Sequence, residues 1–376
     1  MDKYLFFYLK TGGGHLAPAR SVSRFLEEQN PGSVDIRLVD GLAKGPKWLK
    51  AVLEDGYRKA QSGAQWTFEA VYALNKLPFL TQATARLVSF LLEKHLTEVI
   101  LSEKPDKIVI YHFLLIEPVF QILKKHNLNL PVFTVVTDPY TAHPIWFLNR
   151  KSEFIVFSEE VKNICRKSGI AAEKTHVFPF IIDKKFTTEL TSAQISEQKQ
   201  RFGLTQDKTI LIMGGGDGMK GGSSILKKLL KENVQANIII VCGRNERLFT
   251  KATAVKNRFR AENVLIFGFV DFVYELLNIS DVVITKCGAS TFMEILHLKK
   301  IPVINNYIWE QEKGNMEFVV NNRLGLFEKR FGRLTAAVQQ ILTDGTLYRE
   351  FVQNITKREL TNGTPAVAEF IHSYKL

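Results

Sequence analysis

Two glycine-rich segments contain the residues of this sequence that are best suited to bind a phosphate. GGGHLA at residues 12–17 fits the pattern G-x-G-x-x-A, and GDGMKG at residues 216–221 fits G-x-G-x-x-G. Each follows an apolar run and precedes a stretch with helical spacing. Glycine lets the backbone turn tightly and approach a phosphate, while a helix N-terminus offers free N–H groups and partial positive charge. The alternative is that both segments are turns that serve close packing alone.

Two histidines and an aspartate in the first half could take part in proton transfer. His15 lies in the first of these segments, directly after its three glycines, and we expect it in a loop. An imidazole titrates near pH 6.5 when unperturbed, which suits a general base, although this one could also cap a helix or bond to the backbone. His112 ends the apolar run KIVIYH and is a rival for the same role. Asp138 could orient either imidazole, or it could be a turn residue before Pro139.

Residues that suit a nucleotide or a sugar follow the apolar runs of the second half. CGAST is a small-residue turn that opens a helix over 291–298, where Ser290 and Thr291 add hydroxyl donors. Glu294 in this helix could accept hydrogen bonds from two ribose hydroxyls. The later segment EQEKGN supplies groups suited to sugar hydroxyls: Gln311, Glu312 and Asn315. The acidic residues and Gln311 could instead be ordinary surface residues.

Alternating apolar runs and amphipathic segments predict the elements that position these residues. In the first half the runs are YLFFYL, VDIRLVD, KIVIYHF, PVFTVVTD and EFIVFS. After a polar link from about 186 to 208 the pattern restarts, with runs that begin TILIM, NIIIV, NVLIF, DVVIT and IPVIN. Near-continuous apolar runs are typical of parallel strands covered on both faces. Their alternation with helices indicates doubly wound sheets.

The sequence therefore predicts an α/β protein with two Rossmann-like doubly wound domains that face each other across a cleft. We expect an N-terminal domain over 1–185, a C-terminal domain over 186–360, and a final helix within 361–376 that packs back on the first domain. Ligands of such sheets bind beyond the carboxyl ends of the strands. Two facing domains suit a donor on one side and an acceptor on the other.

The charge of the chain is unevenly distributed. Its 376 residues include 50 Lys and Arg against 38 Asp and Glu, a formal net charge of +12. Between Lys220 and Arg260 ten basic residues stand against two acidic ones. Such a surface attracts nucleic acid, an anionic membrane or a phosphorylated substrate, unless it is only a solvated helix face. Because no stacking or groove-binding motif accompanies the charge, we expect no nucleic-acid partner.

The cysteines and the hydropathy of the chain bear on its location. Cys165, Cys242 and Cys287 are far apart, with neither a disulfide pattern nor a zinc spacing, which favours a reducing compartment. No apolar run reaches the roughly 18 residues that a membrane span needs. The N-terminus has no signal-peptide pattern, because its apolar run begins at once.

The stretch from Gly45 to His95 departs from the alternation. It carries aromatic residues among scattered Lys and Arg: Trp48, Trp66, Phe68, Phe79 and Phe90. One interpretation is an inserted amphipathic element that lies on a membrane or binds an acyl chain. The other is a set of ordinary crossover helices that bury these aromatic side chains in the core.

A nicotinamide-dependent enzyme is one alternative function. Asp40 ends the second apolar run, 26 residues after Gly14, where a dehydrogenase would place the acid that holds the cofactor ribose. Against this, His15 stands where pyrophosphate would approach bare backbone. A second Rossmann-like half also exceeds what one dinucleotide site requires.

The order of several motifs resembles that of a known family. The motifs are TGGGHLAPA, TDPYTAHPIWF, MGGGDGMKGG, CGRN, GFV, TKCGAST followed by EIL, and PVINNYIWEQEKGN. They cover nearly the whole chain. The sequence resembles the GT-B-fold glycosyltransferases that include plant monogalactosyldiacylglycerol synthase and bacterial diacylglycerol glucosyltransferase, with the peptidoglycan N-acetylglucosaminyl transferase as a more distant relative.

The resemblance implies an inverting transfer of galactose or glucose from a UDP-sugar to diacylglycerol. It gives His15 the role of the base and places Asp138 beside the cleft, while His112 stays a catalytic candidate on the evidence of the residues alone. The acceptor-side positions it implies are Gly13, Gly14, His143 and Trp146. The donor-binding positions are Gly214, Gly215, Gly216, Arg244, Phe269, Val270, Gly288, Ser290, Thr291, Glu294, Gln311, Glu312 and Asn315. A related enzyme that acts on another lipid or on a cell-wall precursor is the alternative.

The resemblance also implies how the leaving group and the acceptor are handled. Members of this type do not depend on a bound metal for the leaving diphosphate, and the sequence has no Asp-x-Asp pair. Backbone N–H groups of the loop Gly214–Gly218, the helix start at Ser290–Thr291 and Arg244 would then stabilise the diphosphate. Since diacylglycerol lies in a membrane, we expect a peripheral protein on the cytoplasmic face of an anionic membrane.

Overall fold

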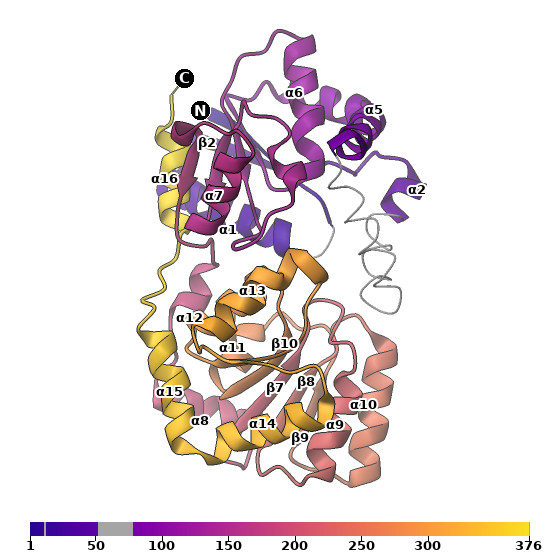
Figure 1. The fold of residues 1–376 in the computed structure, drawn as a ribbon, viewed down its shortest axis with the longest axis vertical. Helices are drawn as coiled ribbons and strands as arrows, with labels where there is room; N and C mark the ends of the chain where they lie inside the picture. Colours follow the sequence, from indigo (N-terminus) through magenta and orange to yellow (C-terminus); the bar gives the residue numbers. More distant parts are fainter. Residues whose placement is uncertain (11–12, 52–77, 376) are drawn as a thin grey trace. The chain divides into compact units, whose positions relative to one another are not determined.

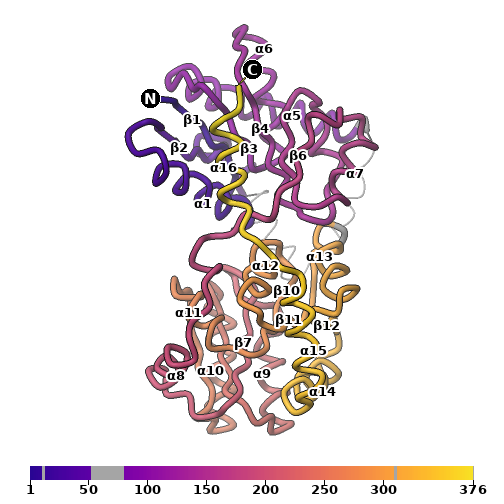
Figure 2. The backbone as a smooth tube through the Cα atoms, turned by 90° about the vertical axis from the view of Figure 1, so that its left-hand side faces the viewer, coloured from indigo at the N-terminus to yellow at the C-terminus, as the bar shows by residue number. Residues whose placement is uncertain are grey.

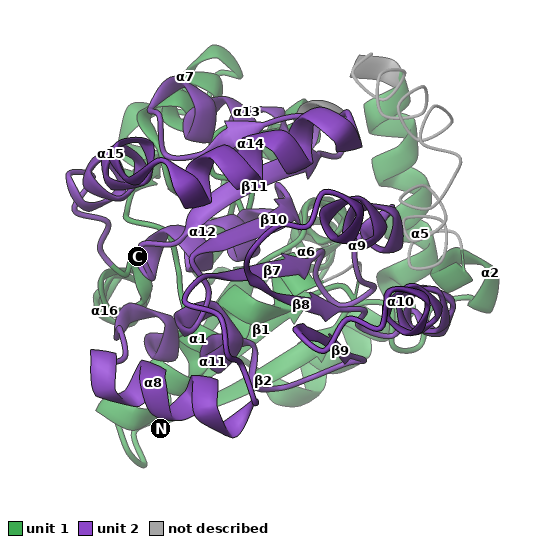
Figure 3. Ribbon diagram, turned by 90° about the horizontal axis from the view of Figure 1, so that it is seen from below, with its two compact units in different colours: residues 1–183, 362–376 green, residues 184–361 purple. Residues whose placement is uncertain are grey.

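Two compact units make up the chain in a computed structural model, which describes residues 1–10, 13–51 and 78–375. Unit 1 contains residues 1–183 and 362–376, and unit 2 contains residues 184–361 (Figure 3). Each unit is built around one six-stranded sheet in which every neighbouring pair of strands is parallel (Figure 1). The predicted α/β class with two doubly wound sheets is therefore confirmed.

The sheet of unit 1 has the order β2-β1-β3-β4-β5-β6. Its strands are β1 (Asp2–Tyr8), β2 (Val34–Asp40), β3 (Lys107–Ile110), β4 (Val132–Val135), β5 (Glu153–Val156) and β6 (Thr175–Val177). The chain reverses its direction of growth after β2, because β3 pairs with the other edge of β1. The carboxyl ends of β1 and β3 are thus adjacent, and ligands of open parallel sheets bind beyond such a switch point.

Helices cover both faces of this sheet. The helices are α1 (Gly13–Gln29), α2 (Lys47–Lys50), α5 (Pro78–Glu103), α6 (Ile116–Lys125), α7 (Glu159–Lys167) and α16 (Thr364–Ser373), with 3-10 turns η2 (Phe113–Leu115), η3 (Pro144–Phe147) and η4 (Ala172–Lys174). α5 and α6 pack on a core that includes Leu5 and Phe7 of β1. Since successive strand residues point to opposite faces, Tyr4 and Phe6 are buried on the other side, where β1 contacts α1.

The C-terminal helix α16 belongs to unit 1, where it lies beside α1 (Figure 2). Buried Lys107 at the start of β3 donates from Nζ to the carbonyl oxygens of Ile371 and His372, at 2.8 and 2.5 Å. The Tyr4 hydroxyl lies 2.9 Å from Nδ1 of His372. The two bonds from Lys107 satisfy carbonyls that a helix end leaves without intrahelical partners. The C-terminal helix α16 is therefore anchored to β1 and β3.

The sheet of unit 2 has the order β12-β11-β10-β7-β8-β9. Its strands are β7 (Thr209–Met213), β8 (Asn237–Val241), β9 (Val264–Phe267), β10 (Val282–Lys286), β11 (Ile301–Asn306) and β12 (Leu326–Phe327). The helices are α8 (Ser192–Arg201), α9 (Gly222–Lys231), α10 (Glu246–Phe259), α11 (Val273–Asn278), α12 (Ala289–His297), α13 (Trp309–Asn321), α14 (Phe331–Thr343) and α15 (Gly345–Thr356), after the 3-10 turn η5 (Lys184–Thr187). β7, β8 and β10 are almost wholly buried, as expected for central parallel strands.

The apolar runs singled out in the sequence all contain strands, but the structure also has elements that these runs do not mark. The edge strands β6 and β12 have only three and two residues, too few to show a pattern. The polar link at 186–208 contains α8 and is not simply a connection. α8 begins with a capping box, in which Thr191 and Gln194 satisfy each other's backbone N–H groups. A polar, largely exposed helix gives almost no apolar period to detect.

The stretch Gly45–His95 is described only in part, and Trp66 and Phe68 lie outside the described residues. α5 buries Val88, Leu92 and Leu96 in the core of unit 1. Phe90 on the same helix is 77% exposed and Trp48 in α2 is 55% exposed. The described residues therefore combine a core crossover helix with aromatic side chains that face solvent. Among the described helices, none is long and apolar enough to cross a membrane.

Candidate functional site

His15 lies in the first turn of α1, beyond the end of β1. The sequence placed it in a loop, whereas the helix already begins at Gly13. Its side chain is 7% exposed. A Cβ atom placed on Gly13 or Gly14 would meet no atom within 4 Å, so the helix start beside His15 borders open space.

Two groups on neighbouring strands fix the orientation of the His15 ring. Nδ1 lies 2.7 Å from the carbonyl oxygen of Tyr111, just past β3, and 2.9 Å from Oγ1 of Thr137, past β4. A carbonyl oxygen can only accept, so Nδ1 carries the proton and donates it. The Thr137 hydroxyl oxygen is then a second acceptor for the same N–H group. It follows that Nε2 of His15 carries the free lone pair.

Burial keeps the His15 imidazole neutral. Desolvation lowers its pKa to about 4, and the bond to the Tyr111 carbonyl opposes this only in part. A charged imidazolium is disfavoured inside a low-dielectric interior. At neutral pH the ring is therefore an unprotonated base whose accepting atom is Nε2.

His112 lies next to His15, but its Nδ1 atom accepts a hydrogen bond, whereas Nδ1 of His15 donates one. Its ring centroid lies 4.5 Å from that of His15. Nδ1 of His112 accepts the backbone N–H of Leu114 at 3.2 Å and so caps the turn η2. Desolvation holds the pKa of His112 well below its usual range, and repulsion from His15 in its protonated form lowers it further. A neutral ring that accepts at Nδ1 must carry its proton on Nε2, so His112 presents a donor and not a base.

Trp146 lies next to these histidines, Asp138 is bonded to it, and His143 caps the turn that carries it; all three are buried. The Trp146 indole donates from Nε1 to Oδ2 of Asp138 at 2.9 Å, and its ring lies 6.5 Å from that of His15. Nδ1 of His143 accepts the N–H of Ile145 at 3.1 Å, which caps η3. Sequence analysis missed Thr137 and the Tyr111 carbonyl as partners of His15. Both follow buried strands, which is the one sequence signal that points to them.

The glycines at 214–218 in unit 2 serve close packing as well as exposing backbone. A Cβ on Gly218 would lie 2.4 Å from the Cys242 carbonyl oxygen, and one on Gly243 would lie 2.3 Å from the Gly216 carbonyl oxygen. Both glycines have a positive φ. The backbone N–H of Arg244 donates to the Gly216 carbonyl at 2.9 Å. The loop after β7 is thereby pressed against the turn after β8.

Three predicted donor-site residues meet at this place. The Arg244 guanidinium lies 3.0 Å from the position that a Cβ on Gly216 would occupy. The same group lies over the ring of Phe269, 4.5 Å from its centroid. Phe269 is 59% exposed and precedes half-buried Val270 in the turn after β9. An exposed aromatic face with a cation above it is suited to stacking against a planar ring.

The start of α12 forms a second group of donors. Gly288 is the N-cap and provides no side-chain cap, so the first backbone N–H groups of the helix are not occupied by one. Ser290 and Thr291 lie in this first turn, and the buried Ser290 Oγ has no hydrogen-bond partner among the described residues. Glu294 lies one turn further along the same helix.

The segment expected to be a sugar-facing loop is the beginning of helix α13. Gln311, Glu312 and Asn315 lie in its first two turns. Oε2 of Glu312, a buried carboxylate, accepts the N–H of Ile308 at 2.6 Å, while Oε1 lies 3.6 Å from the position of a Cβ on Gly288. Asn315 donates to the Cys287 carbonyl at 3.0 Å and leaves its buried Oδ1 without a partner among the described residues. Glu312 and Asn315 therefore face the turn that opens α12.

Two further expectations can be compared with the structure. The Asp40 carboxylate accepts the Leu42 N–H at 3.0 Å through Oδ1 and pairs with Lys10 at 3.5 Å through Oδ2, so it has partners within the protein. These contacts therefore give no support to Asp40 as the acid that would hold the ribose of a nicotinamide cofactor. Within the described part of the chain, no group of three or more His, Cys, Asp or Glu side chains is arranged to hold a metal ion.

Two family models match the chain, one in each unit. Residues 15–181 match the model described as monogalactosyldiacylglycerol (MGDG) synthase, and residues 209–354 match the glycosyltransferase family 28 C-terminal domain. The first match begins at His15 and covers the strands that carry Tyr111 and Thr137. The second match contains the glycine loop after β7, the turn after β8 and the helices α12 and α13.

Two named relatives are similar over most of the chain. A probable chloroplastic monogalactosyldiacylglycerol synthase from Nicotiana tabacum is 26% identical over 350 residues, which are 90% of this chain and 64% of the tobacco protein. A processive diacylglycerol beta-glucosyltransferase from Staphylococcus saprophyticus is also 26% identical, over 88% of this chain and 81% of that protein. The chain thus spans a little under two thirds of the length of the tobacco protein and of several other plant relatives.

Solved structures share this fold over nearly the whole chain. MurG from Acinetobacter baumannii superposes with a TM-score of 0.63, at 15% identity and over the whole of both chains. HepE from Anabaena, in complex with UDP-glucose, gives a TM-score of 0.60 at 14% identity over 99% of this chain and 98% of its own. At this level of identity the likeness concerns the fold alone.

Proposed function

The chain belongs to the glycosyltransferase family of the monogalactosyldiacylglycerol synthases, and from this premise we propose that it transfers a hexose from a UDP-sugar to diacylglycerol. The sugar is galactose or glucose, and the product is a β-glycosyldiacylglycerol. The observation that carries the proposal is the state of His15. Within the segment that matches the MGDG synthase model, a neutral imidazole is held with its lone pair on Nε2.

In the proposed reaction, unit 1 supplies the base. The acceptor hydroxyl has a pKa far above neutrality and must lose its proton as it attacks. Nε2 of His15 takes that proton, and the Tyr111 carbonyl and the Thr137 hydroxyl stabilise the Nδ1–H side of the imidazolium that forms. A positioned general base contributes about 10²–10⁴ in rate. His112, which presents an N–H group, would serve as a hydrogen-bond donor beside it.

Unit 2 would bind the donor. The exposed Phe269 face and Val270 are suited to the uracil ring, and Glu294 to the ribose hydroxyls. Backbone N–H groups of the loop Gly214–Gly218 and of the α12 start would face the diphosphate. Gln311, Glu312 and Asn315 would bind the hexose. Direct displacement at the anomeric carbon breaks its bond to the phosphate oxygen, and an α-linked donor then gives a β-linked product.

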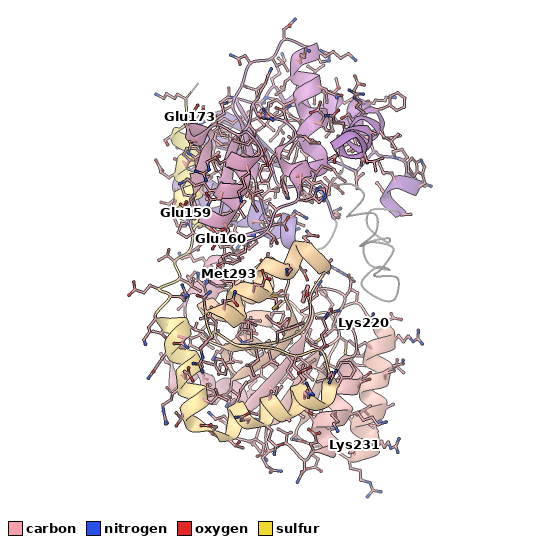
Figure 4. The ribbon with its side chains drawn as sticks, viewed as in Figure 1. Glu159, Glu160, Glu173, Lys220, Lys231 and Met293 are labelled. Atoms are coloured by element: carbon pink, nitrogen blue, oxygen red, sulfur yellow. The ribbon has the colours of Figure 1, made fainter. Side chains whose placement is uncertain are left out.

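The described surfaces support peripheral attachment to an anionic membrane. In α5, Leu87 and Phe90 are 55% and 77% exposed, and they share a face with Arg86 and Lys94 through i, i+3 and i+4 spacing. In unit 2, Lys228 is the one residue among the ten Lys and Arg of 220–260 that forms an ion pair within the described residues. Lys220 and Lys231, labelled in Figure 4, mark the ends of the segment that contains α9. Each basic side chain near an anionic surface contributes about 1 kcal/mol.

The proposal is tested by offering UDP-galactose and UDP-glucose separately to the purified protein with diacylglycerol in anionic vesicles. Formation of a β-linked glycolipid together with UDP would support it and would identify the sugar. UDP release without glycolipid would favour the alternative, a related enzyme that acts on another lipid or on a cell-wall precursor. No turnover with either sugar would contradict the proposed function.

A further inference from the structure

Lys286 is the last residue of β10 and ends an otherwise apolar strand. β10 lies between β7 and β11 in the sheet, and its pairing with β11 shifts between Thr285 and Lys286. The irregularity falls at the carboxyl end of the strand, beyond which ligands of parallel sheets bind.

The Lys286 side chain runs between two glycine turns. Its Cε atom lies 3.9 Å from the position that a Cβ on Gly215 would take and 3.9 Å from that of a Cβ on Gly288. Gly215, with φ +77°, belongs to the loop after β7, and Gly288 opens α12. Both turns therefore bring bare backbone up to the lysine, and a side chain at either glycine would narrow the space around it. The loop after β7 and the start of α12, which the sequence predicts to stabilise the diphosphate, therefore both lie next to Lys286.

The Lys286 ammonium has no hydrogen bond or ion pair among the described residues, although the side chain is half-buried. Two other half-buried lysines of unit 2 have well-placed partners, whereas Lys227 and Lys256, on the outer helices α9 and α10, resemble Lys286 in having none among the described residues. Lys300 donates to the Asn278 carbonyl at 2.7 Å, and Lys208 pairs with Asp281 at 3.1 Å. A partly desolvated cation is stabilised by an anion, and here the protein does not supply one.

Arg244, the cation chosen from the sequence, is placed differently. It is exposed and its guanidinium lies over the Phe269 ring. It approaches Gly216, while Lys286 approaches both Gly215 and the N-cap of α12. An anion bound by the backbone N–H groups of both turns would therefore lie next to the Lys286 ammonium.

We propose that Lys286 is a catalytic residue whose ammonium binds the diphosphate of the UDP-sugar. This inference rests on the function proposed above. As the bond between the anomeric carbon and the phosphate oxygen breaks, its electron pair goes to that oxygen, and the acceptor proton goes to His15. Lys286 transfers nothing. Its fixed charge offsets the negative charge that develops on UDP, in the way that preorganised donors stabilise a transition state.

The test compares the binding of UDP and of uridine, because only UDP carries the diphosphate. Dissociation constants would be measured by calorimetry for the wild type, Lys286→Met and Lys286→Arg. Lys357→Met is the matched control, since Lys357 is an exposed residue at the end of α15. We expect Lys286→Met to weaken UDP binding about 10- to 100-fold and to leave uridine binding within about twofold. Lys286→Arg should retain most of the affinity, and kcat of Lys286→Met should fall about 10²–10³-fold.

Each other outcome overturns a definite part of the account. Equal losses of UDP and uridine affinity in Lys286→Met would mean that the lysine only supports the fold of the site. Unchanged UDP affinity and kcat would exclude it from the diphosphate site. A wild-type protein that binds uridine and UDP equally weakly would overturn the proposed function itself, and the assignment of Lys286 with it.

Discussion

Thr137→Val is the substitution that most sharply tests how His15 is positioned. The change replaces the hydroxyl with a methyl group and removes the 2.9 Å contact to Nδ1 of His15. The 2.7 Å bond from Nδ1 to the Tyr111 carbonyl remains, so the buried N–H group is not left without an acceptor. The net loss is therefore that of one ordinary hydrogen bond, about 0.5–1.5 kcal/mol.

Part of this loss should appear in catalysis. Thr137 helps to select the tautomer and the ring orientation that put the lone pair on Nε2, so its removal lowers the fraction of enzyme with a correctly placed base. Since about 1.4 kcal/mol corresponds to tenfold, kcat should fall about two- to tenfold. KM for the UDP-sugar should stay unchanged, because the donor residues belong to unit 2. Thr137→Ser, which keeps the hydroxyl, should restore most of kcat.

Thr134→Val is the matched control. Thr134 is also buried and lies on β4, but its hydroxyl bonds to Oγ of Ser152 at 2.7 Å, away from the histidines. Both valine variants should lose similar stability in urea unfolding, while only Thr137→Val should lose kcat. Equal kcat values for the two variants, or a Thr137→Ser enzyme as slow as Thr137→Val, would refute a positioning role for Thr137.

Two further predictions concern pH and the membrane. The base must be neutral to act, and burial lowers the pKa of His15 to about 4. The acid limb of log kcat/KM, measured in mixed buffers of constant ionic strength, should therefore have its midpoint well below pH 6.5. A midpoint at pH 6.5 or above would contradict a buried base. The double variant Leu87→Ser/Phe90→Ser should reduce co-sedimentation with anionic vesicles several-fold and leave UDP affinity unchanged. The control variant Gln82→Ser/Ala83→Ser, which changes two other exposed residues of the same helix, should reduce neither. Equal vesicle binding by the two double variants would exclude this face of α5 from attachment.

The sequence predicts the sheets of this protein well, because parallel strands that are covered on both faces leave long apolar runs. VDIRLVD corresponds to β2 residue for residue, and DVVITK contains β10. The short edge strands β6 and β12 and the polar helix α8 escape, because two or three residues, or a helix without a buried face, carry no apolar period.

The site is predictable only in part, for reasons that lie in three-dimensional contacts. The glycine turns and His15 can be found because backbone freedom and imidazole chemistry are visible in the residue types. Thr137 and the Tyr111 carbonyl become partners of His15 only because β1, β3 and β4 end side by side. Lys286 acquires significance only when Gly215 and Gly288 are seen on either side of it.

The rate of glycolipid formation by the wild type and by His15→Ala, measured with UDP-hexose and diacylglycerol in one vesicle preparation, tests the central claim most directly. The account predicts a β-linked glycosyldiacylglycerol from the wild type and a rate about 10²–10⁴-fold lower for the variant, with UDP affinity retained. A wild type that forms no glycolipid, or a His15→Ala enzyme that works at close to the wild-type rate, would contradict it.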